Sequence, residues 1–323
     1  MPRKHIFYVH GRNTKPSPAV FKRQVKTALG ARLRHVNSKA ADVFDSADTK
    51  FTVAYYGDLM NELMVQAQPE LTNQMLLRNG KWVEPRGHNA ASFEQLIRRP
   101  TRSHRESDYR ELVGKHRNRR FLSEVARLFG PVGSITGFTT YAIKRMFPDF
   151  GAYLTSRRWS SQIRARLQGS LKRALARGDD IAVIAHSMGC IVSYDVLWKL
   201  SRMYEHRNIH DRKISLWLTL GCPLGERSIR SELYDADEPD DGLYPANIRH
   251  WVNAAAHDDY VTQDGTVAND FSEMLERGLV KSIKDLPRIH TFWVGSKGSN
   301  PHKSFGYLNH PTVARVVARW LKR

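Results

Sequence analysis

A strand, a sharp turn and a helix follow one another without a break in the segment IAVIAHSMGCIVSYDVL, residues 181–197. The apolar or small residues 181–185 predict a buried strand. His186-Ser187-Met188-Gly189 then forms the turn. The helical spacing that follows is carried by Ile191, Tyr194, Val196, Leu197 and Leu200. So tight a connection is typical of α/β proteins, and it places a serine at the end of a buried strand.

The turn has the spacing of a nucleophile elbow. In that motif a serine occupies strained backbone at the top of a sheet, and the residues two before and two after it must be small to avoid a clash. Here they are Ala185 and Gly189, so the pattern is Ala-x-Ser-x-Gly rather than Gly-x-Ser-x-Gly. A structural turn can carry the same residues, but the predicted strand and helix on the expected sides favour Ser187 as a nucleophile. His186 should point away from the hydroxyl and serve a structural role.

Further predicted strands alternate with predicted helices along the chain. Strands are expected at 5–9, 51–56, 181–185, 214–220, 248–255 and 289–294, and helices at 20–33, 159–176, 191–200, 270–277 and 313–321. This alternation predicts an α/β fold with a mostly parallel, doubly wound sheet and helices on both faces. We expect a single domain over residues 1–323.

Residues 60–150 interrupt the alternation. Helical patterns at 94–99 and 111–129 are followed by Gly130-Pro131 and Gly133. We expect an inserted helical cap over one end of the sheet rather than an independent domain. Residues 121–150 are moderately apolar, which fits either a lid that meets an acyl chain or a packing cap without ligand contact.

Positive charge is concentrated in the middle of the chain. The 323 residues carry a formal charge of +19, and residues 78–177 hold 22 Lys or Arg against 7 Asp or Glu. A basic surface favours anionic partners, and an anionic membrane is one candidate for residues 78–177. A solubilising helical surface is the alternative. We do not expect nucleic acid as a partner, because no zinc-ligand spacing or RNP-type aromatic string accompanies the charge.

The chain lacks the usual marks of export. Its first apolar stretch, residues 6–9, is too short for a signal peptide, and no run of about 18 apolar residues exists to span a membrane. The two cysteines, Cys190 and Cys222, form no disulfide framework. We therefore expect a cytoplasmic protein, with peripheral membrane association as a further option.

Candidate site residues follow five predicted strands. They are His10-Gly11, Ser187, Gly221-Cys222, Asp258-Asp259 and His302. Ligands of parallel sheets bind at the carboxyl ends of the strands, so we expect these residues to meet at one edge of the sheet.

Serine chemistry needs a base and a carboxylate, and the chain offers both in order after Ser187. A serine hydroxyl reacts only when a histidine, oriented by a carboxylate, accepts its proton. Asp258 and Asp259 compete as the acid; we favour Asp259 and leave Asp258 open, with Asp264 a distant third. His302 lies between the last strand and the last helix, where the base is expected. His290 falls within the predicted last strand and His310 at the start of the last helix, which makes both poorer candidates.

The oxyanion of such a reaction needs backbone donors. The N–H of Met188, the residue after the nucleophile, is one expected donor. A second should come from the loop after the first strand, at Gly11 or Arg12, where glycine lets the backbone approach closely. The Arg12 side chain is alternatively suited to bind an anionic part of a substrate.

Five motifs together resemble the α/β-hydrolases of the serine esterase and lipase type, in particular lipase-like and inositol-deacylase-like bacterial hydrolases. They are YVHGRN (8–13), AHSMG (185–189), TLGCP (219–223), WVNAAAHDDYV (251–261) and NPH (300–302). The resemblance covers residues 5–57 and about 155–323. It implies hydrolysis of a small-molecule or lipid carboxylic ester through an acyl-enzyme, without metal or organic cofactor. A thioesterase or amidase, or a silent module that binds anionic membrane or nucleic acid, is the alternative. Ala185 and Cys222 depart from the family pattern, where glycine and serine are usual.

Overall fold

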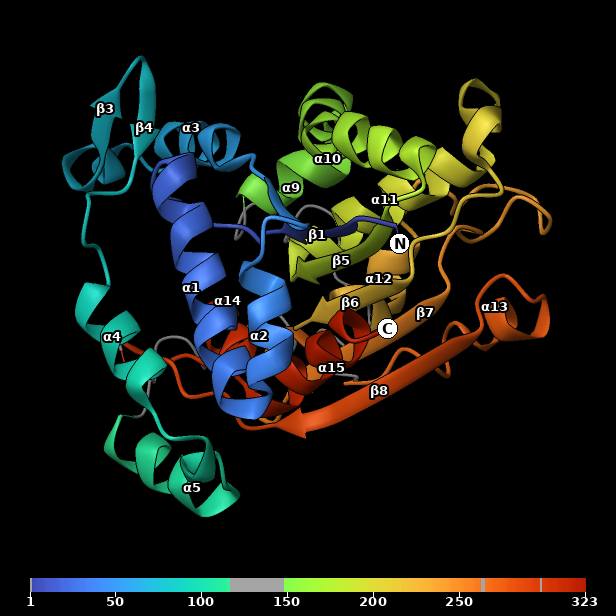
Figure 1. The fold of residues 1–323 in the computed structure, drawn as a ribbon. Helices are drawn as coiled ribbons and strands as arrows, with labels where there is room; N and C mark the ends of the chain where they lie inside the picture. The colour runs from blue at the N-terminus through green and yellow to red at the C-terminus, as the bar shows by residue number, and fades with distance from the viewer. Residues whose placement is uncertain (1, 117–147, 263–264, 297) are drawn as a thin grey trace.

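The computed structural model describes residues 2–116, 148–262, 265–296 and 298–323 (Figure 1). Within these ranges six strands form one sheet in the order β2-β1-β5-β6-β7-β8, and every neighbouring pair is parallel. The strands are β1 (Lys4–Val9), β2 (Thr49–Ala54), β5 (Asp180–His186), β6 (Leu216–Leu220), β7 (His250–Ala256) and β8 (Ser282–Ile289). The predicted α/β class with a parallel sheet is confirmed.

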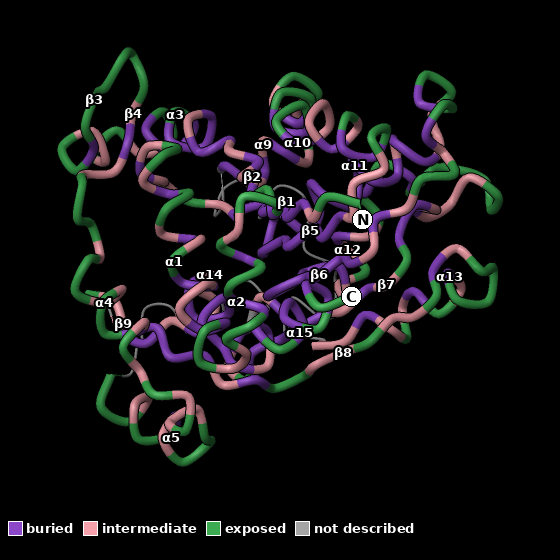
Figure 2. The backbone as a smooth tube through the Cα atoms, in the orientation of Figure 1, coloured by how far each residue is buried: buried purple, intermediate pink, exposed green. Residues whose placement is uncertain are grey.

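The central strands are apolar on both faces, and helices cover both faces. In β1 the side chains of Ile6 and Tyr8 enter one hydrophobic core, while Phe7 and Val9 enter the other. This period of two is the pleat of a strand, and a strand buried on both sides has no polar face. Figure 2 shows the central strands β1, β5 and β6 as mostly buried, and only the first residues of β1 and β5, Lys4 and Asp180, are partly exposed.

One helical layer packs on the side of Ile6 and Tyr8, and a second on the side of Phe7 and Val9 (Figure 1). The first layer contains α1 (Pro18–Val36), α2 (Ser38–Asp45), α14 (Ser304–Leu308) and α15 (Pro311–Leu321). The second contains α3 (Gly57–Ala67), α9 (Pro148–Thr155), α10 (Arg157–Arg177), α11 (Met188–Arg202), α12 (Arg227–Arg230) and α13 (Ser272–Glu276). The sheet is therefore doubly wound, as predicted.

The inserted region is only partly described. It contains α3, the hairpin of β3 (Leu76–Arg78) and β4 (Lys81–Val83), α4 (Ala90–Arg98) and α5 (Glu106–Lys115). The hairpin tip and α5 are largely exposed (Figure 2). The predicted lid at 121–150 lies outside the described residues except for its last three positions. None of the helices in the described ranges is both long and apolar enough to cross a bilayer.

The last strand of the sheet differs from its prediction. We expected it at 289–294, but β8 covers Ser282–Ile289, and residues 294–295 and 298–299 form a separate small pair, β9 (Val294–Gly295) and β10 (Gly298–Ser299). β8 is an edge strand, so its outer side faces solvent and tolerates Lys284, Pro287 and Arg288. The apolar Phe292 and Trp293 that suggested a strand are buried in a loop instead.

Candidate active site

The candidate site lies where the strand order reverses. From the adjacent central strands β1 and β5, the chain builds outward in opposite directions, to β2 on one side and to β6, β7 and β8 on the other. The loops after such a pair part from each other and leave a crevice at the carboxyl ends of the strands. Gly11 follows β1 and Ser187 follows β5, so the two flank this crevice.

Ser187 has the backbone of a strained turn. Its φ is 54° and its ψ is −127°, a conformation that costs a non-glycine residue about 1–3 kcal/mol. Two hydrogen bonds hold it: the Ser187 N–H donates to the carbonyl of Leu220 at 3.0 Å, and its carbonyl accepts from the N–H of Cys190 at 2.8 Å. The neighbouring strand β6 and the first turn of α11 thus fix the serine at the sheet edge.

Gly189 is required by β1. A Cβ at position 189 would lie 2.5 Å from the carbonyl oxygen of Val9 and 2.6 Å from that of His10. The elbow motif explains small residues by a clash between positions 185 and 189, but here the nearest obstacle to a side chain at 189 is the backbone of the adjacent strand.

Ser187, His302 and Asp259 form one continuous chain of hydrogen bonds. The Ser187 hydroxyl lies 2.8 Å from Nε2 of His302, and Nδ1 of His302 lies 2.7 Å and 2.9 Å from the two carboxylate oxygens of Asp259. The Asp259 side chain is fully buried, whereas that of His302 keeps 14% exposure. In the tautomer that fits this geometry, Nδ1–H donates to the carboxylate and Nε2 accepts from the hydroxyl.

Of the two aspartates that the sequence leaves open, Asp259 is the one in contact with His302. The Asp258 carboxylate turns away, accepting a hydrogen bond from the Tyr109 hydroxyl at 2.9 Å and lying 2.8 Å from Nδ1 of His257. The structure therefore does not bring Asp258 into the Ser187–His302 cluster. Asp264 lies outside the described residues.

Tyr307 is a member of this cluster that the sequence did not reveal. Its hydroxyl donates to Asp259 at 2.6 Å and accepts from the N–H of Ala256 at 2.8 Å. Burial, and then the charge of Asp259, holds the pKa of Tyr307 well above its usual value, so the hydroxyl stays protonated and donates. The N–H of Val261 gives the carboxylate a further donor at 3.1 Å.

Gly11 lets the loop after β1 touch the serine. A Cβ at position 11 would lie 2.9 Å from the Cβ of Ser187 and 2.9 Å from Nδ1 of His186. Met188 is the first residue of α11, so its N–H has no carbonyl partner within the helix. The two segments expected to supply oxyanion donors therefore both border the serine.

The Arg12 side chain is engaged by the segment before α10. Its guanidinium donates to Asp149 at 3.1 Å, and the N–H of Asn13 donates to the same carboxylate at 2.7 Å. Asp149 is fully buried. The structure thus places the Arg12 guanidinium in a loop anchor, which limits the alternative role of binding an anionic substrate.

Lys15 also stabilises the loop after β1, through hydrogen bonds to its carbonyl groups. The Lys15 ammonium donates to the carbonyls of Arg12 at 2.6 Å and Asn13 at 2.8 Å. Burial, together with the positive charge of Lys303, lowers the pKa of Lys15 to about 7. The carbonyl of Thr14, at 3.4 Å, is the third loop oxygen within hydrogen-bond distance of this ammonium, so Lys15 links three consecutive carbonyls of the loop.

His186 supports the loop that carries His302. Nε2 of His186 lies 2.8 Å from the carbonyl oxygen of His302. Burial is the main cause that holds the pKa of His186 well below its usual value, so the ring stays neutral and donates. Its structural role, away from the Ser187 hydroxyl, agrees with the expectation from the sequence.

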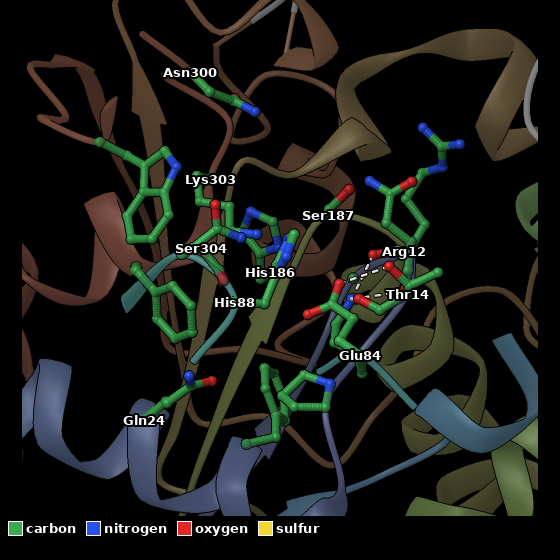
Figure 3. A pocket seen from close by; sticks show the side chains of 18 of the residues that line it. Arg12, Thr14, Gln24, Glu84, His88, His186, Ser187, Asn300, Lys303 and Ser304 are labelled. Carbon is green, nitrogen blue, oxygen red and sulfur yellow. Dashed lines mark hydrogen bonds between the residues drawn. The ribbon is translucent and has the colours of Figure 1, made fainter. Parts of the chain in front are cut away.

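A pocket opens over Ser187 and His302 (Figure 3). The inserted region contributes to its wall, and apolar rings form one side of it. The insertion supplies Glu84, His88, Asn89 and Phe93; the rings are Phe21, Phe93, Trp293 and Phe305. No group of His, Cys, Asp and Glu side chains suited to a metal occurs in the described part of the chain.

Cys222 has a packing role. It is buried in the same core as Cys190, beneath the elbow, and both are free thiols. Burial, and then contact with Cys222, raises the pKa of Cys190 well above its usual value. A side chain larger than serine therefore fills apolar space here.

Comparisons with protein-family models, curated proteins and solved structures gave no match to this chain.

Proposed function

We propose that this chain is a serine hydrolase of the α/β-hydrolase type that cleaves a carboxylic ester through an acyl-enzyme. One observation carries the proposal: the unbroken series of hydrogen bonds from Ser187 through His302 to Asp259, with the serine in strained backbone beside a pocket. The parallel sheet and the motifs at its carboxyl edge are further support.

In the first half of the reaction the ester carbonyl carbon is attacked by Oγ of Ser187. Nε2 of His302 takes the hydroxyl proton as the new C–O bond forms, and Asp259 stabilises the resulting imidazolium. The carbonyl oxygen becomes an oxyanion, held by the N–H of Met188 and an N–H of the Gly11–Arg12 segment. His302 then gives its proton to the departing alcohol, which leaves an acyl group on Ser187.

In the second half water replaces the alcohol. His302 removes a proton from the water, whose oxygen attacks the acyl carbon, and the same oxyanion donors act again. Collapse of the intermediate breaks the bond to Oγ, and His302 returns the proton to Ser187. The products are one carboxylic acid and one alcohol, and the enzyme is unchanged. None of these steps requires a cofactor.

The test is a panel of 4-nitrophenyl acyl esters of increasing chain length. We expect Ser187→Ala to lower kcat by at least about 10³-fold and to abolish labelling by a fluorophosphonate. Ser304→Ala is the matched control, because Ser304 lines the same pocket, whereas the hydroxyl within hydrogen-bond distance of Nε2 of His302 is that of Ser187. Labelling that survives Ser187→Ala, or that is lost in Ser304→Ala, would contradict the proposal.

The basic stretch motivates a second proposal. We infer that residues 78–177 promote peripheral binding to anionic membranes, because their charge excess has no counterpart in the rest of the chain. Salt-sensitive binding to anionic vesicles without esterase activity would favour a silent binding module. A substrate screen with thioesters and amides distinguishes the remaining alternative, a thioesterase or amidase, from an esterase.

The cytoplasm is the compartment that we propose, since both cysteines are free thiols.

A further inference from the structure

The charged side chains that line the pocket differ in the partners that they contact. Arg12 is paired with Asp149, and the Lys15 ammonium is occupied by loop carbonyls. Glu84 accepts a hydrogen bond from the Thr14 hydroxyl at 2.6 Å. Lys303 is the fourth: among the described residues, neither a carboxylate in ion-pair contact nor a hydrogen-bond acceptor accompanies its ammonium.

Aromatic rings hold this ammonium at the pocket wall. Nζ of Lys303 lies 5.4 Å from the ring centre of Trp293 and 5.8 Å from that of Phe305. Such cation–π contacts stabilise a lysine by roughly 0.5–2 kcal/mol without neutralising its charge. Lys303 directly follows His302 and lines the same pocket as Ser187 (Figure 3).

The partly buried ammonium of Lys303 is suited to bind an anion. Burial lowers the pKa of Lys303, and the charge of Glu84 opposes that shift. An ammonium with little water around it gains more from an anionic partner than an exposed one does, since the attraction is less screened. Besides Glu84, the ionisable groups of the insertion side and of the loop after β1 that line this space are Arg12, Lys15 and His88, and none of these three supplies negative charge.

We propose that Lys303 binds an anionic oxygen group of the substrate, so that the site hydrolyses esters carrying a carboxylate or a phosphate close to the scissile bond. The inference rests on the proposed function, because it assigns the substrate class of the same site. The ammonium meets the anionic group, while the rings of Trp293 and Phe305 pack against the carbon chain between that group and the ester.

The experiment compares matched anionic and neutral esters. The first pair is 4-nitrophenyl hydrogen glutarate and its methyl ester, followed by release of nitrophenol. The second pair is glycerol 3-phosphate monobutyrate and monobutyrin, followed by titration of butyric acid. For each pair the ratio of kcat/KM, anionic over neutral, is measured in wild type, Lys303→Met and Lys303→Arg. Lys284→Met is the control, because Lys284 is an exposed lysine of the edge strand β8.

We expect wild type to prefer one anionic ester and Lys303→Met to lose roughly tenfold or more of that ratio, the size of a hydrogen bond to a charged group. Lys303→Arg should restore part of it, and Lys284→Met should equal wild type. An effect on the glutarate pair identifies a carboxylate on the acyl side, and one on the other pair a phosphate on the alcohol side. A wild type without preference in either pair overturns the inference, even if Lys303→Met does not fold.

Ser187→Ala separates this inference from the proposed function. If Ser187→Ala is inactive and the ratios do not depend on Lys303, the inference fails alone. If Ser187→Ala is as active as wild type, the proposed function fails. The anion site is then judged by calorimetry with glutarate, where a Kd equal in wild type and Lys303→Met overturns it and a Kd at least tenfold weaker in Lys303→Met supports it.

Discussion

Tyr307→Phe tests whether the buried hydroxyl beside Asp259 stabilises the fold. The register of β7 on β8 shifts between Ala254 and Ala256, and the N–H of Ala256 is satisfied by the Tyr307 hydroxyl at 2.8 Å. The same hydroxyl donates to Asp259 at 2.6 Å. Phenylalanine keeps the ring and removes both hydrogen bonds, so packing in the core changes little.

The expected loss follows from these two contacts. A hydrogen bond to a charged group contributes about 1.5–3 kcal/mol, and a buried N–H left without a partner costs about 1–3 kcal/mol. Tyr307 is fully buried, so water does not replace the hydroxyl. Because the two effects share one site and partly overlap, we expect the free energy of unfolding to fall by about 3 kcal/mol.

Urea unfolding measures this loss, provided that the m-value is unchanged between variants. Tyr204→Phe is the matched control, because Tyr204 is 75% exposed and its variant should unfold within about 0.5 kcal/mol of wild type. A loss in Tyr307→Phe below about 1 kcal/mol, or one no larger than in Tyr204→Phe, would refute the reasoning, since it would mean that Ala256 and Asp259 find other partners.

Two further substitutions probe the acid and the pH dependence. Asp259→Asn should lower kcat for a 4-nitrophenyl ester by about 10³–10⁴-fold, while Asp258→Asn should change it less than about threefold; equal effects would contradict the geometry. Burial lowers the pKa of His310 from 6.5 to about 3, so below pH 6.5 the unfolded chain takes up a proton that the folded chain does not. The free energy of unfolding therefore falls as pH drops from about 6.5 to about 3, by up to about 1.4 kcal/mol per pH unit. His310→Asn keeps an acceptor for the N–H of Thr312 and should flatten this slope when unfolding is measured across acid pH. An unchanged slope would exclude His310 as its source.

The central strands were predictable because burial on both faces leaves a continuous apolar run. Residues 5–9, 181–185 and 214–220 carry such runs, and the structure has strands there. The edge strand β8 was not predictable in the same way, because Lys284 and Pro287 suit a solvent-facing edge and hide the pattern. The loop after it carries the apolar residues instead, since Phe292 and Trp293 pack into the core without forming a strand.

The sequence predicts those residues of the candidate site whose location follows from their position after a strand or before a helix. Ser187 follows a buried strand and His302 precedes the last helices, so both meet at the carboxyl edge of a parallel sheet. Asp258 and Asp259 are adjacent in one turn, and only the three-dimensional path of that turn decides which carboxylate faces His302. Tyr307 belongs to no motif; its one signal was a tyrosine inside the apolar run FGYL, a short distance after the histidine.

The reversal of strand order between β1 and β5 explains why glycine stands at two positions of the site. At this point the ends of β1 and β5 lie side by side before their loops separate. Gly11 therefore lies against Ser187, and Gly189 lies against the carbonyl of Val9. Where the backbone segments lie this close, there is no room for side chains to pack between them. The loop after β1 is instead held by the Asp149 carboxylate, which accepts hydrogen bonds from the Arg12 guanidinium and from the Asn13 N–H. The position of the expected oxyanion donors therefore depends on a carboxylate that lies at the far end of the inserted region.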